Sequence, residues 1–256
     1  MRPAYDLCGL GLNFVNKECY SYTSSIVNTY HAALYRVFLP RKDENGDRVG
    51  PYVCEDTTPF QHTFANWRIP TCDAPLDRPA FAARFPGIKG QAYKRECDQL
   101  DKGTHKEYNH FIMGGKCKVN GFTKFEKYMK VTDPRMITMF PRWYNIELGR
   151  AYCRIEAPLL KSFNAMCGFT ACAKGLNMDQ RAQALEQHMN RLNGVVAVGL
   201  DVSRWDSGVS NKSLKYEFKF YRAIFEKNFD QKTVTYLMNL LSLQYSPKVS
   251  CRGIDG

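Results

Sequence analysis

An apolar run that ends in an acid is the feature that most constrains this chain. Residues 195–200 read Val-Val-Ala-Val-Gly-Leu, and Asp201 follows directly. The run is short, rich in β-branched residues and contains a glycine, which predicts a buried strand rather than a helix. A carboxylate at the end of a buried strand is costly unless its charge is compensated, and a divalent cation is the usual compensation. The sequence therefore predicts a metal ligand at one edge of a sheet.

A second acid, Asp206, follows five positions later, beyond a turn that contains serines and Gly208. Two acids at this distance also occur by chance in many proteins. The alternative interpretation is that Asp206 caps the following helix and that Asp201 makes a hydrogen bond at the strand end. The two acids alone leave both interpretations open.

The charge balance favours a polyanionic partner. The 256 residues include 36 Lys and Arg against 25 Asp and Glu, a formal net charge of +11, and the pI is near 9.1. Such a balance suits nucleic acid or a membrane surface, and a basic protein with a solvated charged face is the alternative. The hydrophobic content of 44% is sufficient for a core, so the chain is not predicted to be disordered.

The cysteine pattern and the hydropathy indicate the cellular compartment in which the chain folds. The ten cysteines never form a Cys-x-x-Cys pair, and the tightest pair, Cys167 and Cys172, has no second pair at zinc-site spacing. Free thiols in a reducing compartment fit this pattern best. The sequence has no apolar run of about 18 residues and no N-terminal signal pattern, which predicts a soluble, cytosolic chain without a transmembrane segment.

Cations alternate with aromatic and apolar residues between positions 122 and 142. They are Lys124, Lys127, Lys130, Arg135 and Arg142. Charges that alternate along a β-ribbon share one face, and such a face would hold a nucleoside triphosphate through charge-assisted hydrogen bonds. The alternative is a salt-bridged hairpin in which Glu126 and Asp133 are the counter-ions.

A second basic feature is the Gly-rich turn Phe-Pro-Gly-Ile-Lys-Gly-Gln-Ala-Tyr at residues 85–93. Backbone amides at Gly87 and Gly90, with Lys89 beside them, would suit a phosphodiester contact. An ordinary turn into the helix predicted over residues 93–100 is an equally good interpretation.

Apolar periodicity predicts several further helices. They cover residues 149–163, where Pro158 is expected to stall the helix, residues 179–192, residues 213–229, and a last helix around residues 234–241. The apolar stripes of the last two helices predict packed core rather than a ligand site.

The order of these features resembles one family. Asp-x-Ser-x-Trp-Asp at residues 201–206 is similar to motif A of viral RNA-dependent RNA polymerases, in the form typical of tombusvirus-like plus-strand RNA viruses. Phe-x-Lys-x-Glu-Lys from Phe122, Pro-Arg-x-Ile from Pro134 and the segment from Pro141 to Arg150 resemble the fingers motif F and its continuation. Residues 174–185 resemble the segment that leads those enzymes into motif A. The three ordered blocks span roughly residues 85–230.

This resemblance implies an α+β chain with the right-hand polymerase fold. Residues 1–84 would be an N-terminal extension with fingers, residues 85–190 fingers with the basic nucleotide channel, and residues 191–256 a partial palm, an antiparallel sheet backed by helices. In the resembled enzymes a motif B loop and a Gly-Asp-Asp hairpin come next, and neither is present here. We therefore expect a chain truncated before the catalytic hairpin and inactive alone.

The resemblance also implies roles for single residues. Asp201 would be the catalytic ligand of Mg²⁺ or Mn²⁺ in a two-metal nucleotidyl transfer. Asp206 would face the incoming ribose and accept a hydrogen bond from its 2′-hydroxyl. The remaining assignments are nucleotide contacts by Arg135, Lys124, Lys127 and Arg142, and RNA contacts by Lys89, Gly90 and Lys130.

The implied function is RNA-directed synthesis of a plus-strand viral RNA genome. Template RNA and nucleoside triphosphates would be the partners, together with other viral replication proteins that hold the chain at membrane-associated complexes in the host cytoplasm. The competing hypothesis is a non-enzymatic RNA-binding protein that uses the same basic and aromatic ribbon. A metal-dependent phosphohydrolase built on Asp201 is more remote, because the His and extra acids of such sites are lacking.

Overall fold

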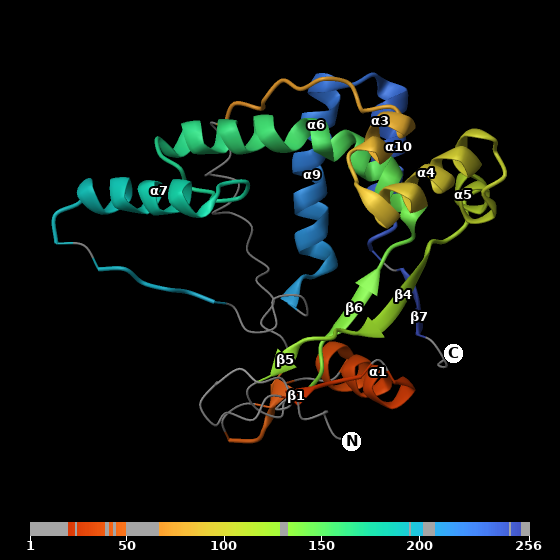
Figure 1. The fold of residues 1–256 in the computed structure, drawn as a ribbon, viewed down its shortest axis with the longest axis horizontal. Coiled ribbons are helices and arrows are strands. Elements are labelled where there is room, and N and C mark those ends of the chain that lie inside the picture. The colour runs from red at the N-terminus through yellow and green to blue at the C-terminus, as the bar shows by residue number, and fades with distance from the viewer. Residues whose placement is uncertain are drawn as a thin grey trace.

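Helices dominate the described chain, and small sheets lie between the main group of helices and the N-terminal helix at residues 26–32 (Figure 1). The computed structural model describes residues 20–23, 25–38, 41–42, 45–49, 67–128, 133–194, 196–201, 208–245 and 247–251. Within these ranges helices and strands occur together, so the predicted α+β class is confirmed. Among the described helices, none is both long enough and apolar enough to cross a lipid bilayer.

The helices supply most of the core. They are α1 (Ile26–Ala32), which continues into the π-helix η1 (Ala33–Phe38), α3 (Arg78–Ala83), α4 (Gly87–Asp101), α5 (Lys106–Ile112), α6 (Arg142–Cys167), α7 (Met178–Asn190), α9 (Asn211–Asn228) and α10 (Gln231–Ser242). Helices α3, α4 and α10 pack on α6, and α9 packs on α10. Their buried side chains form one continuous cluster.

Helix α6 is longer than the sequence predicts. The helix expected over residues 149–163 is present, but α6 runs past Pro158 without ending there. A proline inside a helix loses one backbone hydrogen bond and costs about 3 kcal/mol. Before Pro158, α6 fully buries side chains such as Ile146 and Ile155 against its neighbours. This packing outweighs the local cost, so the stall predicted at Pro158 is wrong.

The apolar stripes of α9 and α10 form core, as predicted. On α9 the side chains of Phe218, Ile224 and Phe225 are buried, and on α10 those of Leu237 and Leu241 are buried. Both helices begin at a capping side chain, since the hydroxyl or carboxylate of the preceding residue accepts a backbone N–H from the first turn. The capping residues and the apolar periodicity therefore both indicate helices in these two segments.

A three-stranded sheet lies beside the helices. Its central strand, β4 (Lys118–Thr123), pairs antiparallel with β6 (Met136–Met139) and parallel with β7 (Lys248–Cys251). Gly121 permits this packing, because a Cβ atom there would lie 2.3 Å from the Met136 Cε and 2.8 Å from the Cys251 Sγ. Two short pairs complete the described strands: β1 (Tyr20–Ser21) with β5 (Lys127–Tyr128), and β2 (Arg41–Lys42) with β3 (Arg48–Val49).

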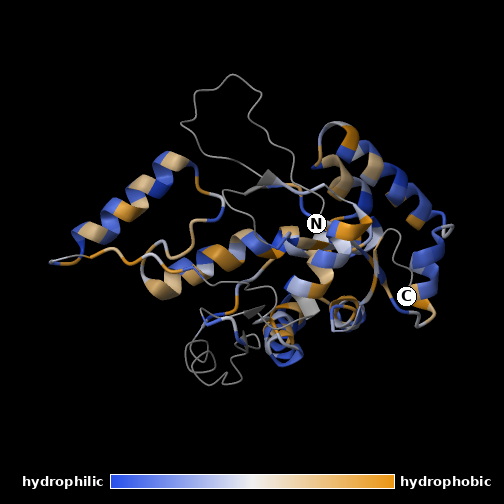
Figure 2. Cartoon of the chain, turned by 90° about the horizontal axis from the view of Figure 1, so that it is seen from below, coloured by the Kyte–Doolittle hydropathy of each residue, from blue (hydrophilic) through white to orange (hydrophobic). Residues whose placement is uncertain are grey.

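The strand predicted for residues 195–200 is wrong over its described part, residues 196–200. These residues form no strand, and the side chains of Val196, Val198 and Leu200 are 82%, 75% and 91% exposed. A buried strand needs neighbours for its backbone and cover for both faces, and no described strand pairs with this stretch. The stretch instead crosses beneath α7, where its hydrophobic character is visible (Figures 1 and 2).

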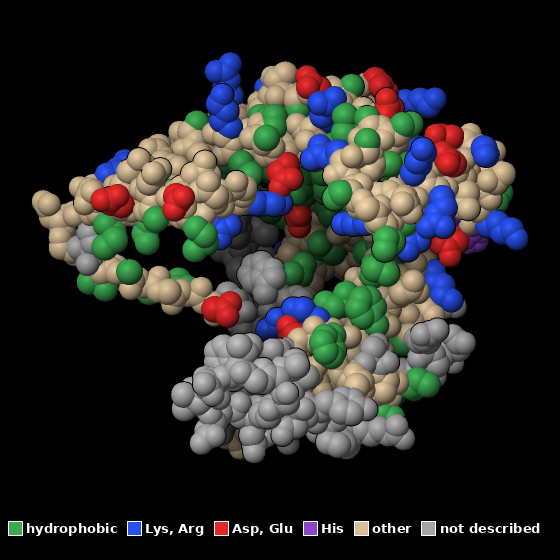
Figure 3. Space-filling model, in the orientation of Figure 1, with side chains coloured by type: hydrophobic (Ala, Val, Ile, Leu, Met, Phe, Trp, Pro, Cys, Tyr) green, Lys and Arg blue, Asp and Glu red, His purple; other side chains and the backbone are tan. Residues whose placement is uncertain are grey.

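The apolar stripe of α7 is likewise uncovered. This helix confirms the one predicted over residues 179–192, but Leu185, Met189 and Leu192 on its predicted apolar face are 58%, 46% and 65% exposed. Figure 3 shows hydrophobic side chains along the underside of α7 and on the segment below it. The periodicity of α7 therefore predicts its helix correctly without indicating what the helix packs against.

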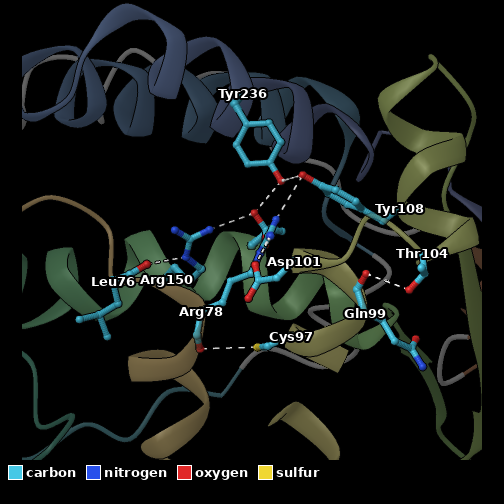
Figure 4. A network of polar contacts seen from close by, with 10 residues as sticks. Leu76, Arg78, Cys97, Gln99, Asp101, Thr104, Tyr108, Arg150 and Tyr236 are labelled. Carbon is cyan, nitrogen blue, oxygen red and sulfur yellow. Dashed lines mark hydrogen bonds and ion pairs between the residues drawn. The ribbon is translucent and has the colours of Figure 1, made fainter. Parts of the chain in front are cut away.

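A buried carboxylate connects three helices. Glu147 of α6 is 3% exposed. Its Oε1 accepts a hydrogen bond of 2.6 Å from Arg78 of α3, and its Oε2 accepts bonds of 3.2 Å from Arg150 and 2.7 Å from the hydroxyl of Tyr236 on α10. Figure 4 shows these groups converging. Every oxygen of the carboxylate is therefore hydrogen-bonded, which is the condition for burying such a charge.

Arg78 extends this network to α4 and α5. Its guanidinium also lies 2.7 Å from the Asp101 Oδ1 at the end of α4, and it donates to the Tyr108 hydroxyl of α5 over 3.4 Å. Burial lowers the pKa of Arg78, but the hydrogen bonds to Glu147 and Asp101 outweigh this and raise it. Burial and the Glu147 carboxylate raise the pKa of Tyr236, so its hydroxyl stays protonated and donates. Both raised pKa values keep Arg78 charged and Tyr236 protonated near neutral pH.

Removing the Glu147 charge should destabilise the fold. We expect Glu147→Gln to lower the free energy of unfolding by about 3 kcal/mol, because the poorly exposed guanidinium of Arg150 loses its counter-ion and that of Arg78 keeps only Asp101. Urea denaturation followed by helical circular dichroism measures this loss. The matched control is Glu226→Gln, whose carboxylate is 49% exposed and lies 3.5 Å from Arg222; it should cost about 0.5 kcal/mol or less. Equal losses in the two variants would contradict the role assigned to Glu147.

Candidate functional site

The basic ribbon brings two of its predicted cations together. The Lys124 Nζ lies 2.7 Å from Glu126 Oε2, and the Arg135 Nε lies 3.2 Å from Glu126 Oε1. A backbone hydrogen bond of 2.8 Å from Lys124 N to Arg135 O fixes the two chain segments. The Lys124 and Arg135 side chains are 41% and 50% exposed. The salt-bridged alternative is therefore present here, with half-exposed cations that a phosphate could reach.

The second counter-ion predicted for this ribbon, Asp133, contacts the N-terminal helices. Its carboxylate lies 3.8 Å from the His31 Nδ1 of α1, and its backbone carbonyl accepts a 3.3 Å hydrogen bond from Arg36 of η1. Nearby, the buried hydroxyls of Thr29 on α1 and Thr123 on β4 lie 3.1 Å apart. Residues that are far apart in sequence thus fix the loop that carries Arg135.

The remaining cations of the ribbon lie apart or outside the described residues. Arg142 is exposed at the first position of α6, and its charge lowers the pKa of Tyr93 on α4, although burial raises that pKa more. The backbone of Lys127 pairs with Ser21 between β5 and β1. The Lys127 side chain and the whole of Lys130 lie outside the described residues.

The Gly-rich turn is the start of α4, which begins earlier than predicted. Gly90 lies within the first turn of this helix and its N–H donates to the Pro86 carbonyl over 3.4 Å. A Cβ atom at Gly90 would lie 1.9 Å from the Phe85 carbonyl oxygen, so close packing requires the glycine. The ammonium of Lys89 lies 4.6 Å from the centre of the Phe85 ring, a cation–π contact. The RNA contact of this turn stays a prediction, for which Lys89 is the group that a phosphate could reach.

Asp201 is an exposed carboxylate at the end of the segment beneath α7. Within the described part of the chain it makes no ion pair or side-chain hydrogen bond, and no three His, Cys, Asp or Glu side chains gather there. Asp206 lies outside the described residues. A carboxylate has the donor chemistry that Mg²⁺ or Mn²⁺ prefers, so the exposed Asp201 side chain fits the role of a metal ligand.

Sequence reasoning missed a cavity between the ends of α6 and α7. It has a volume of about 200 Å³ and is lined by Asn164, Gly168, Phe169, Thr170, Gln187, His188 and Arg191. His188 and Arg191 share a face because they are three residues apart near the end of α7. The sequence shows that spacing and shows Phe169 directly after Gly168, which ends α6. It does not indicate that the ends of α6 and α7 lie together.

Comparison with known proteins places these features in one family. The family described as viral RNA dependent RNA polymerase matches residues 12–253. Two curated relatives, the RNA-directed RNA polymerases of Cucumber necrosis virus and Tomato bushy stunt virus (strain Cherry), are 33% and 32% identical over 149 residues, or 58% of this chain and 18% of theirs. That of Pothos latent virus (isolate Pigeonpea/India) is 27% identical over 252 residues, or 95% of this chain and 32% of its own length.

The match covers almost all of the chain but little of its relatives. The chain spans 18% to 32% of the lengths of these three polymerases. No solved structure matches it. Since the family match extends from residue 12 to residue 253, this chain belongs to the viral RNA-dependent RNA polymerase family.

Proposed function

We propose that the chain is the fingers and the start of the palm of an RNA-directed RNA polymerase that replicates a plus-strand viral RNA genome. The observation that carries this proposal is the family match over residues 12–253. The half-exposed cations of the ribbon and the exposed carboxylate of Asp201 support it, because they supply the two kinds of group that nucleotidyl transfer requires.

The proposed architecture is the right-hand polymerase fold. Residues 1–84 belong to an N-terminal extension and fingers, residues 85–190 to fingers with the nucleotide channel, and residues 191–256 to a partial palm. In this arrangement the uncovered stretch 196–200 gains its neighbouring strands from a following segment that carries Gly-Asp-Asp. The much greater length of the related polymerases is consistent with such a segment.

Asp201 is the proposed catalytic carboxylate. Two divalent ions, Mg²⁺ or Mn²⁺, would activate the primer 3′-hydroxyl and neutralise the leaving pyrophosphate. Asp201 would hold them with acids of the Gly-Asp-Asp segment, and the exposure of its carboxylate supports this role. Asp206 would accept a hydrogen bond from the 2′-hydroxyl of the incoming nucleotide and thereby select RNA precursors.

Lys124 and Arg135 are proposed to bind the triphosphate. The Glu126 carboxylate already holds the two cations side by side, at 2.7 and 3.2 Å. Phosphate oxygens would replace Glu126, with Arg135 able to make two parallel hydrogen bonds and Lys124 supplying a point charge. Lys127 and Arg142 would add to the positive potential that attracts the nucleotide.

The proposed partners are template RNA and nucleoside triphosphates. Lys89, Gly90 and Lys130 would lie along the RNA path. We further propose that other viral replication proteins hold the enzyme at membrane-associated complexes in the host cytoplasm. A protein that only binds RNA would use the same cations, and the role of Asp201 separates the two functions.

Substitution of Asp201 tests the enzymatic function. In the complete enzyme we expect Asp201→Asn to abolish template-dependent nucleotide incorporation, because a metal ligand is lost, while RNA affinity stays near the wild-type value. Primer extension and RNA-binding titrations measure the two properties. Asp179→Asn, at the start of α7, is the matched control and should keep activity. Substantial turnover by Asp201→Asn would exclude the metal role.

The isolated chain should be inactive. We expect the purified 256-residue chain to incorporate no nucleotide on a primed template with Mg²⁺ or Mn²⁺, because the acids that complete the metal site come from another segment. Radiolabel incorporation is the measurement. Activity from this chain alone would refute the proposed division of the metal site.

Neutralising Glu126 should strengthen triphosphate binding. We expect Glu126→Gln to bind ATP about 2- to 5-fold more tightly at low salt, because two cations no longer share a surface carboxylate. Isothermal titration calorimetry with the purified chain measures this change. Glu226→Gln on α9 alters the net charge equally and should have little effect, since screening limits distant charges. An equal gain in both variants would assign the effect to net charge alone.

A further inference from the structure

The cavity between α6 and α7 lies where both helices end. The two helices run in the same direction, so their C-terminal ends are neighbours, and the segment leading to Asp201 leaves from there (Figure 1). Residues from both ends line a cavity of about 200 Å³, several times the ~30 Å³ that one water molecule occupies in the liquid. The cavity is therefore large enough for more than isolated waters.

Aromatic rings and a cation form one side of this cavity. Phe169 is 42% exposed. Its ring meets that of His188 edge to face, with centroids 4.5 Å apart, and the Arg191 guanidinium lies 5.6 Å from its centroid. Partly exposed aromatic rings with a neighbouring arginine are the surfaces on which unpaired bases stack.

Polar groups that line the cavity have fixed orientations. The Asn164 Oδ1 accepts hydrogen bonds from Ala171 N and Cys172 N at 3.0 and 3.2 Å, so its amide nitrogen points elsewhere and can donate. The His188 Nε2 lies 3.0 Å from the Thr170 carbonyl, which can only accept. Nε2 therefore carries the proton, and Nδ1 can accept. Two residues that line the cavity, Asn164 and His188, can thus supply a donor and, in the neutral imidazole, an acceptor.

The electrostatics favour a base over a phosphate in the cavity. No Asp or Glu is among its lining residues, but two helix C-terminal ends carry partial negative charge, which disfavours a phosphate between them. Arg191 donates to the Gly168 carbonyl over 3.2 Å at the end of α6 and is exposed. A neutral ring with donor and acceptor edges suits the interior of the cavity, with its flanking phosphates in solvent.

We propose that this cavity binds one base of single-stranded RNA, which stacks on Phe169 and bonds through its edge to Asn164 and His188. The proposal rests on the proposed function, since it assigns part of the RNA path of the polymerase. The site lies away from the ribbon of Lys124 and Arg135. It would hold a nucleotide of the strand close to the segment that ends in Asp201.

The test measures binding of a labelled single-stranded oligouridine to the purified chain by fluorescence anisotropy. We expect Phe169→Ala to weaken binding about 5- to 100-fold, the loss that corresponds to one stacked base. Phe169→Tyr should bind nearly as well as wild type, since the ring is kept. Leu185→Ala, an exposed position on α7 outside the cavity, is the matched control. The salt dependence of binding should be unchanged in Phe169→Ala, because no phosphate contact is lost.

The outcomes separate this site from the proposed function. Equal affinities of Phe169→Ala and wild type would overturn the site and leave the polymerase proposal intact. A loss accompanied by weaker salt dependence would indicate a phosphate contact and would also overturn it. Photo-crosslinks from thiouridine-substituted RNA should map to the peptides of residues 164–191, and crosslinks only elsewhere would overturn the site. Absence of any RNA binding by wild type would overturn the site, whereas the activity of Asp201→Asn tests polymerase function independently.

Discussion

The buried charge of Glu147 sets the arrangement of the helical part of the chain. A carboxylate that loses water must regain every hydrogen bond from protein groups, and here the donors come from α3, α6 and α10. Because each donor has a direction, the three helices cannot slide or rotate independently without breaking a bond. Apolar packing around this point fills space, and the hydrogen bonds of the carboxylate add a directional constraint to it. α4 and α5 follow through Arg78.

The ribbon that carries Lys124 and Arg135 is connected to these packed helices, because β6 leads directly into α6. β6 ends three residues before α6 begins, and its pairing with β4 brings Lys124 opposite Arg135. The positions of Lys124 and Arg135 thus follow from the strand register. Their positive charges are balanced by the Glu126 carboxylate. Glu126 keeps the like charges of Lys124 and Arg135 side by side while no ligand is bound. The two cations are therefore already in position to bind an anion such as a phosphate group. The same geometry explains why both interpretations of this ribbon could be drawn from the residues alone.

Local patterns predicted the five longest described helices, α4, α6, α7, α9 and α10, but not the shorter ones and not the long-range contacts. The buried faces of α9 and α10 could be predicted, because the spacing of apolar residues within a few turns shows which face of a helix is buried. The partners of Glu147 lie 69 and 89 residues away at Arg78 and Tyr236, and no spacing in the sequence indicates them. The strand expected before Asp201 fails for the same reason, since a buried strand is defined by neighbours that its own residues do not specify. Motif order identified the family, while the cavity beside Phe169 needed the fold.

The uncovered stretch beneath α7 also has a consequence for the association of the chain with copies of itself. Residues 195–200 contain no charge and no proline and are rich in β-branched side chains, the composition of segments that associate with copies of themselves as intermolecular strands. With Val196, Val198 and Leu200 all more than 70% exposed, this stretch favours aggregation of the folded chain wherever no partner covers it. Asp201 then also opposes aggregation, because a charge that flanks such a run repels the same charge on identical chains.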